Sequence, residues 1–343
     1  DCFLMCGVNG IVSPDLSSQD INRRLDLMNG ILRHRGPDDT RNDVRSACGK
    51  TVGLGFVRLS ILDLETGMQP IHCDLDDTAI LCNGQIYNYL ELKEMVKTEP
   101  FFSKGDVEVA LHLYRKKGID FLSYLNGMYA GAILDPNINR LFLFRDRFGI
   151  KPLYYSIQKN EFIFSSEIKP LIACSGILPE MNVHRLATYF TYRYIPGSET
   201  MFKGIFRVPP GSFLEYDLTN GKFQIIRYWD YQLDNINQDM TIEEAAHTFY
   251  ELFEDSVKIR LRSDVEVGSL ISGGIDSSAV SAQAAVNQSA IQLFSIAFEE
   301  EKYNELDHVK YLLSADPEKF ASSKLNSQIC RKNHLGQLPG IVK

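Results

Sequence analysis

The first half of the chain contains short apolar runs that are separated by turn residues. Asp135-Pro136-Asn137 and Lys159-Asn160 are examples of these turn sequences. Short apolar runs between such signals predict β-strands. The predicted strands are Gly7 to Val12, Val52 to Arg58, Ala79 to Leu81, Tyr129 to Leu134, Leu141 to Arg145 and Glu161 to Ser165.

Two stretches of the first half have a helical period instead. Residues 21–33 and 107–117 carry apolar side chains three or four positions apart, which is the spacing of one helix face. These side chains are Ile21, Leu25, Met28, Leu32, Val107, Ala110, Leu111 and Tyr114. Helices that interrupt strands without strict alternation indicate an α+β, largely antiparallel domain.

Residues 193–240 are rich in Pro, Gly, Asn and aromatic residues, and we expect the connection between two domains here. A helix should follow, because Thr241 and Glu244 form a capping-box pattern that satisfies two free N–H groups. Apolar residues at helical spacing predict its buried stripe, namely Ala245, Phe249, Leu252, Phe253 and Val257.

The segment after this helix has the pattern strand, glycine loop, helix. Val265 to Ile271 is an apolar run typical of a buried parallel strand, and residues 279–286 are helical in pattern. Between them, Ser272 to Ser278 reads SGGIDSS, so several backbone N–H groups and a helix N-terminus would face one point and form an anion site. Asp276 suits a phosphate-bound Mg²⁺. A Gly-Gly turn with a serine N-cap is the alternative.

The length, charge and composition of the chain exclude several classes of protein function. A length of 343 residues favours two domains, and the net charge of -8 argues against a nucleic-acid partner. No window of 18 apolar residues occurs, so we expect no membrane span. The seven cysteines include no CxxC pair, which indicates that the protein works in a reducing compartment, the cytoplasm. The seven histidines show no metal-ligand spacing.

The residues Met5-Cys6-Gly7 suggest an N-terminal cysteine nucleophile. If Met5 starts translation and is removed, the Cys6 thiol becomes a nucleophile with its own α-amine as base, and that amine titrates near pH 8. A buried cysteine beside a glycine turn is the alternative. While Asp1 to Met5 remain, Cys6 has no free α-amine and this chemistry should fail.

Several ordered motifs resemble the glutaminase domain of class II glutamine amidotransferases, in the asparagine synthetase version. They are His34 to Asp38, Arg58 to Ile61, Asn83 to Tyr89, Asn126 to Ala130 and Arg145 to Tyr155. The Ser272 to Ser278 heptad resembles the PP-loop of ATP pyrophosphatases. The resemblance implies an Ntn-hydrolase-like αββα sandwich over 6–192, a connection over 193–240, and an incomplete α/β PP-loop domain over 241–343.

The resemblance also implies roles for single residues. Cys6 would attack the glutamine carboxamide, and Asn83 with the Gly84 N–H would form the oxyanion hole. Arg58 would pair with the substrate α-carboxylate, and Asp106 would hold its ammonium group. Other glutamine contacts would be Leu59, Ser60, Ile61, Leu62 and Gln85. Many relatives have glutamate where Gln85 stands, so we expect weaker glutamine binding.

In the second domain, the resemblance implies ATP and Mg²⁺ as cofactors and aspartate as the acceptor of ammonia. Asp276 would serve the metal. The ATP contacts would be Leu270, Ser272, Gly273, Gly274, Asp276, Ser277, Ser278 and Ile296. Members of the family are commonly homodimers, so the resemblance makes a homodimer one candidate assembly, but nothing in the sequence fixes the oligomeric state.

Two features depart from that family. The chain lacks the later Ser-Gly-x-Gly-x-Asp-Glu segment of the synthetase domain, and after about Tyr311 it matches no pattern of the family. The sequence therefore leaves three functions open. They are asparagine synthesis, amidation of another carboxylate, and a catalytically silent chain that binds glutamine, nucleotide or a partner.

Overall fold

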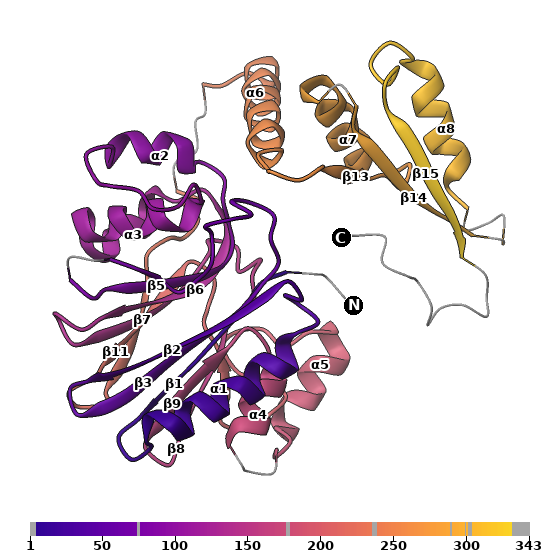
Figure 1. The fold of residues 1–343 in the computed structure, drawn as a ribbon. Coiled ribbons are helices and arrows are strands. Elements are labelled where there is room, and N and C mark those ends of the chain that lie inside the picture. Colours follow the sequence, from indigo (N-terminus) through magenta and orange to yellow (C-terminus); the bar gives the residue numbers. More distant parts are fainter. Residues whose placement is uncertain are drawn as a thin grey trace. The chain divides into compact units, whose positions relative to one another are not determined.

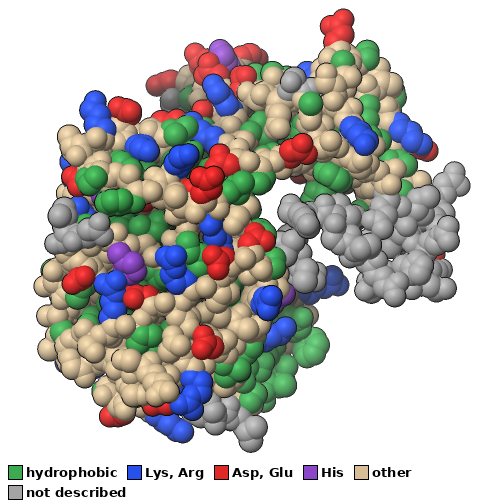
Figure 2. Space-filling view, viewed as in Figure 1, with side chains coloured by type: hydrophobic (Ala, Val, Ile, Leu, Met, Phe, Trp, Pro, Cys, Tyr) green, Lys and Arg blue, Asp and Glu red, His purple; other side chains and the backbone are tan. Residues whose placement is uncertain are grey.

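The computed structural model describes residues 5–73, 76–175, 179–234, 239–288, 290–298, 300 and 304–330. The chain divides into two compact units, residues 1–232 and 233–343, and each is described by itself (Figure 1). None of the helices within the described ranges is long and apolar enough to cross a membrane. On the face seen in Figure 2, acidic and basic side chains are interspersed.

Two six-stranded sheets form the centre of the first unit, and all their strand pairs are antiparallel. The first sheet has the order β10 (Ile205–Arg207), β8 (Tyr154–Gln158), β9 (Glu161–Ser165), β1 (Gly7–Ser13), β3 (Lys50–Arg58) and β2 (Asp39–Ala47). The second has the order β12 (Phe223–Arg227), β11 (Ser212–Asp217), β7 (Arg140–Arg145), β6 (Gly127–Asp135), β5 (Ala79–Ile86) and β4 (Ile71–His72).

Helices cover the outer face of each sheet. Side chains of α1 (Ser18–Leu32) and α4 (Ile168–Ser175) share an apolar core with β1 and β9. Those of α2 (Tyr89–Met95) and α3 (Asp106–Lys117) share another with β5, β6 and β7. A third core fills the space between the sheets. These layers form the expected αββα sandwich (Figure 1).

The strands and helices expected in the first half are all present, and most are longer by one to five residues at their ends. The spacing of apolar residues in these elements matches the buried positions, because each strand presents alternate side chains to two different apolar layers. The shorter elements η1 (Gly118–Tyr124), η2 (Val183–Arg185) and α5 (Leu186–Tyr192) complete the unit.

The segment 193–240 differs from its expected role as a connection. Strands β10, β11 and β12 lie within it, and they pair with β8, β7 and β11. Phe213, Leu214 and Tyr216 are buried in the cores of the first unit. The compact unit therefore runs to Gln232, because the aromatic residues of this segment are core residues.

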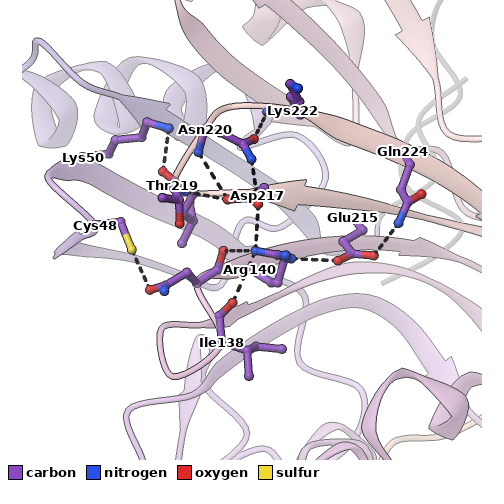
Figure 3. A network of polar contacts seen from close by, with 12 residues as sticks. Cys48, Lys50, Ile138, Arg140, Glu215, Asp217, Thr219, Asn220, Lys222 and Gln224 are labelled. Atoms are coloured by element: carbon purple, nitrogen blue, oxygen red, sulfur yellow. Dashed lines mark hydrogen bonds and ion pairs between the residues drawn. The ribbon is translucent and has the colours of Figure 1, made fainter.

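A polar network lies at the ends of the strands β7 and β11 (Figure 3). Arg140 Nε is 2.7 Å from Glu215 Oε1, and Arg140 Nη1 is 3.1 Å from Asp217 Oδ2. Lys50 Nζ, from the other sheet, donates to the Leu218 carbonyl oxygen at 2.6 Å. The Lys50 contact links the two sheets. The ion pairs of Arg140 lie at the surface and are partly exposed, and pairs of this kind contribute little to stability individually.

The second unit has an α/β arrangement. Its elements are α6 (Ile242–Arg260), β13 (Gly268–Leu270), α7 (Ile275–Asn287), β14 (Gln292–Phe298), α8 (Leu306–Ala315) and β15 (Lys324–Cys330). The three strands are parallel, in the order β13-β14-β15. The capping box at Thr241 and Glu244 is confirmed. Strand β15 lies in the tail where the sequence showed no recognisable pattern.

Two expectations for this unit are wrong. The predicted stripe of α6 is buried at Val257, but Phe249 is 70% and Leu252 is 66% exposed, because only the C-terminal end of α6 packs on the described core. The predicted buried strand over Val265 to Ile271 is reduced to the edge strand β13, in which Leu270 is 64% exposed. Helices cover one face of this sheet, so its strands are buried on one side only.

Candidate active site

A pocket in the first unit gathers most of the predicted glutaminase residues. The space inside it and at its mouth totals about 710 Å³. It is lined from the ends of β1, β3 and β5, from the loop after β3 and from the start of α3. The predicted residues that line it are Cys6, Arg58, Leu59, Ile61, Leu62, Asn83, Gly84, Gln85 and Asp106. Segments up to a hundred residues apart in sequence thus meet at one site.

Cys6 lies immediately before β1 with its thiol against the end of β3. Its Sγ accepts a hydrogen bond from the Leu59 N–H at 3.3 Å and is 3.5 Å from the Leu59 carbonyl oxygen. Burial raises the pKa of the Cys6 thiol above its ordinary value, although the Leu59 N–H and the cations Arg58 and Lys151 oppose this. The resting group at neutral pH is therefore the thiol, and a nucleophilic reaction requires a base.

The His34 to Asp38 motif holds the backbone beside Cys6. Arg35 Nε donates to the Cys6 carbonyl oxygen at 3.1 Å, and the Met5 N–H donates to the Arg35 carbonyl at 2.8 Å. Glu167 accepts from Arg35 Nη1 at 3.2 Å and neutralises its charge. Position 36 must be glycine, because a Cβ there would lie 2.5 Å from the Val57 carbonyl carbon.

Asn83 and Gly84 lie at the end of β5 and both line the pocket. In the orientation that satisfies both ends of its amide, Asn83 donates to the Cys6 carbonyl at 2.9 Å and accepts from Arg35 Nη2 at 3.3 Å. Gly84 has a φ of +152°, and a Cβ there would lie 2.0 Å from the Met128 carbonyl oxygen. Only glycine allows β5 and β6 to approach this closely.

Arg58 is buried at the end of β3, where its guanidinium lines the pocket. It donates to the carbonyl oxygens of Asp63 and Leu64, which holds the loop that follows β3 around it. Leu59, Ile61 and Leu62 of this loop line the pocket as expected. Ser60 is not among the lining residues, and its N–H donates to Asp38 Oδ2 at 2.8 Å.

Asp106 is the first residue of α3 and is buried at the back of the pocket. Its Oδ2 accepts from the Ile86 N–H at 2.7 Å. Burial raises the pKa of Asp106 to about 6, although the backbone N–H groups of Ile86, Asp106 and Val107 stabilise the carboxylate. A carboxylate kept in so apolar a place can bind a cation strongly.

The raised pKa of Asp106 has a consequence for stability. The folded state binds this proton more tightly than the unfolded chain does, so stability falls as pH rises from 3.8 to about 6. Above pH 6 the full cost is about 3 kcal/mol. We expect Asp106→Asn to raise the free energy of unfolding at pH 8 by up to about 3 kcal/mol, and by much less at pH 4. Urea unfolding at the two pH values measures this, and equal effects at both would contradict it.

Lys151 is a pocket residue that received no role from the sequence. It is 5% exposed and lines the pocket beside Met5 and Cys6. The signal for it is a single charged residue in the apolar run Ile150 to Tyr155, which would otherwise be expected to point to solvent. Met128 and Gln69 also line the pocket without having been predicted.

The loop between β13 and α7 has the geometry expected of an anion site. Gly273 has a φ of +81°, and a Cβ there would lie 2.8 Å from His308 Cβ, so glycine is required. Gly274 is the N-cap of α7 and offers no side chain to the free N–H groups of the first turn. Ser277 Oγ accepts from the Ser272 N–H at 3.1 Å and closes the loop. This arrangement fits a phosphate group.

The other predicted ATP residues surround this loop. Leu270 and Ile296 are 64% and 45% exposed on the face of the parallel sheet that no described helix covers. Gly274 and Asp276 are exposed at the loop, and Ser278 is partly exposed in the first turn of α7. Asp276 suits a Mg²⁺ that is held mainly by phosphate oxygens. Within the described ranges, no group of three acidic, His or Cys side chains could hold a metal ion by itself.

Comparison with known proteins agrees with this architecture. A family model of the glutamine amidotransferase domain matches residues 5–229, and one of asparagine synthase matches residues 248–315. The chain belongs to the glutamine amidotransferase family, in the group that continues into an asparagine synthase domain.

Several relatives are named glutamine-hydrolysing asparagine synthetases. Asparagine synthetase 2 of Bacillus subtilis is 37% identical over 83% of this chain and 39% of that protein. Asparagine synthetase 1 of the same organism is 32% identical over 98% of this chain and 52% of that protein. Amidase chry2 of Gibberella zeae is 34% identical over 80% of this chain and 42% of that protein. The chain thus spans about half the length of these relatives.

A solved structure shares the fold. The allosteric regulatory enzyme of purine biosynthesis matches with a TM-score of 0.50 over 94% of this chain and 80% of that chain. The sequence identity is 16%, so the match concerns the fold alone. It supports the αββα arrangement of the first unit.

Proposed function

We propose that the first unit hydrolyses glutamine to glutamate and ammonia at Cys6. The observation that carries this proposal is the pocket itself, which combines a thiol, a buried guanidinium and a buried carboxylate. A guanidinium pairs with the α-carboxylate of an amino acid, and a carboxylate pairs with its ammonium group. Glutamine held by both charged groups on its α-carbon would be free to extend its side-chain carboxamide toward Cys6.

The reaction requires Cys6 to be the first residue. Its α-amine would then take the thiol proton while Sγ attacks the carboxamide carbon, and the carbonyl oxygen would become an oxyanion. Asn83 Nδ2 and the Gly84 N–H would stabilise that charge. The amine would return its proton to the leaving nitrogen, which releases ammonia and leaves a γ-glutamyl thioester. Water would hydrolyse the thioester to glutamate and restore the thiol.

We propose that ammonia is used by an ATP-dependent amide synthesis to which the second unit contributes. A carboxylate does not react with ammonia, but its adenylate does, so ATP would first transfer AMP to the acceptor carboxylate. The uncapped N-terminus of α7 and Gly273 would hold the pyrophosphate, and Asp276 would serve Mg²⁺. When bound, Mg²⁺ would neutralise phosphate charge.

Aspartate is the proposed acceptor, since most of the named relatives are asparagine synthetases. Another carboxylate is the second candidate, because a relative of similar identity is named an amidase. ATP–pyrophosphate exchange with aspartate and with other carboxylates would distinguish the two. Exchange that depends on aspartate alone is expected, and exchange only with another acid would favour the second candidate.

The glutaminase proposal is tested by comparing two N-termini. One protein starts at Asp1, and the other is expressed from Met5 so that methionine removal exposes Cys6, as verified by intact mass. We expect glutamate release from the second protein only. Equal release from both would exclude the α-amine as the base. No release from either would leave a chain that binds glutamine or a partner without catalysis.

A further inference from the structure

Lys151 is a buried ammonium group next to the proposed nucleophile. Its Nζ donates to Met5 Sδ at 2.6 Å, and both residues line the pocket with Cys6. Among the residues that the structure describes, Nζ forms no ion pair with a carboxylate. A thioether is a weak acceptor without charge, so the positive charge of Lys151 is not neutralised by its direct partner.

Several hydrogen bonds fix the backbone of the loop that carries Lys151. Asp146 is fully buried and accepts hydrogen bonds from four backbone N–H groups, those of Tyr129, Phe148, Ile150 and Lys151, at 2.9 to 3.2 Å. Arg145 Nε donates to the Lys151 carbonyl at 2.7 Å. The loop between β7 and β8 is therefore rigidly tied, and its lysine is directed toward the residue before Cys6.

We propose that Lys151 keeps the α-amine of Cys6 in its neutral, proton-accepting form. This inference rests on the proposed glutaminase function. Once Met5 is removed, the ammonium loses its thioether partner and faces the new N-terminus. A neighbouring positive charge disfavours protonation of an amine, whose ordinary pKa of about 7.7–8.0 would leave it mostly protonated at neutral pH. Lys151 would act through the amine and not on glutamine.

The other charged groups around this point do not supply the same effect. Arg35 is paired with Glu167, and Arg58 would be paired with the substrate carboxylate. Asp106 favours protonation in the empty pocket but would be paired with the substrate ammonium. The Asp146 carboxylate already accepts hydrogen bonds from four backbone N–H groups. The groups that face Cys6 or Lys151 are Arg35, Arg58, Cys82, Asp106 and Asp146. Among the described charged groups around Cys6, Lys151 is thus the cation that would keep no carboxylate partner in the proposed substrate complex.

The test is the pH dependence of kcat for glutamate release by the Cys6-terminated chain at saturating glutamine. We expect Lys151→Met to move the acid limb upward by about one pH unit, with rates approaching wild type near pH 9. Lys151→Arg should keep the limb in place. Lys50→Met, which removes an ammonium outside the pocket, should also leave it unchanged. A uniform loss at every pH in Lys151→Met would overturn the proposal.

A second measurement does not need catalysis. In the Cys6-terminated chain labelled with ¹⁵N-cysteine, the Cys6 α-nitrogen is an amine and the other labelled nitrogens are amides, so its titration can be followed by NMR. Asp106 acts equally on the wild-type amine and on that of Lys151→Met, so we expect the midpoint to rise by about one pH unit in Lys151→Met, and equal midpoints would overturn the role of Lys151. If wild type released no glutamate, the proposed function would fail, whereas the titration would still decide the effect of Lys151.

Discussion

Replacing Cys6 with alanine should abolish glutamate release from the Cys6-terminated chain while leaving the fold intact. The loss should reach about 10⁴-fold or more, since burial raises the pKa of Cys82, the other thiol that lines the pocket, and keeps that thiol protonated. Glutamine binding should persist, because Arg58 and Asp106 are unchanged. Steady-state kinetics and equilibrium binding of glutamine would measure the two effects.

A matched control separates nucleophile loss from general loss of a thiol. Cys48 is exposed at the polar network of Figure 3, where its Sγ donates to Asn139 Oδ1 at 2.6 Å. We expect Cys48→Ala to keep full activity. Residual activity of Cys6→Ala within tenfold of wild type would show that another group carries out the attack.

The second large effect is expected at Gly84. An alanine there would place its Cβ against the Met128 carbonyl oxygen, at 2.0 Å in the present backbone. Strand β5 would have to move away from β6, and the Asn83 amide and Gly84 N–H would move with it. Loss of an oxyanion donor costs about 10²–10³-fold in kcat, and overpacking of this kind costs about 1–3 kcal/mol in stability.

Gly30 provides the control for this substitution. It lies near the end of α1 with ordinary backbone angles, and a Cβ there would meet nothing within 4 Å. We expect Gly30→Ala to be neutral or stabilising by up to about 1 kcal/mol, with unchanged kcat. If Gly84→Ala kept wild-type kcat, the close approach of β5 and β6 would have no part in catalysis.

Six strands and the two longest helices of the first unit could be predicted from local patterns. These strands bury every second side chain in one apolar layer and these helices bury side chains three or four positions apart, so apolar residues recur in the sequence with the same spacing. Other elements, among them β2, β8 and α4, received no prediction. In the segment 193–240, Pro and Gly at the turns hid the pattern of the buried side chains Phe213, Leu214 and Tyr216. In a hairpin such as β11–β12, turn residues and core residues alternate within a few positions.

The pocket was only partly predictable. Motifs indicated Cys6, Arg58, Asn83 and Asp106, and the structure brings them together. Lys151 was not predicted, because a lone lysine in an apolar run is expected to point to solvent. Its burial beside Met5 became visible only in the structure. The stripe of α6 shows the reverse case, since an apolar period identifies a face but not the partner that covers it.

The most direct measurement is a search for the acyl intermediate on Cys6. The Cys6-terminated chain would be mixed with glutamine, quenched in acid during turnover and digested for mass spectrometry. We expect a γ-glutamyl group on the peptide that begins with Cys6, and none on the Cys6→Ala variant or the chain that starts at Asp1. Glutamate release without this adduct, or an adduct on Cys82 instead, would contradict Cys6 as the nucleophile.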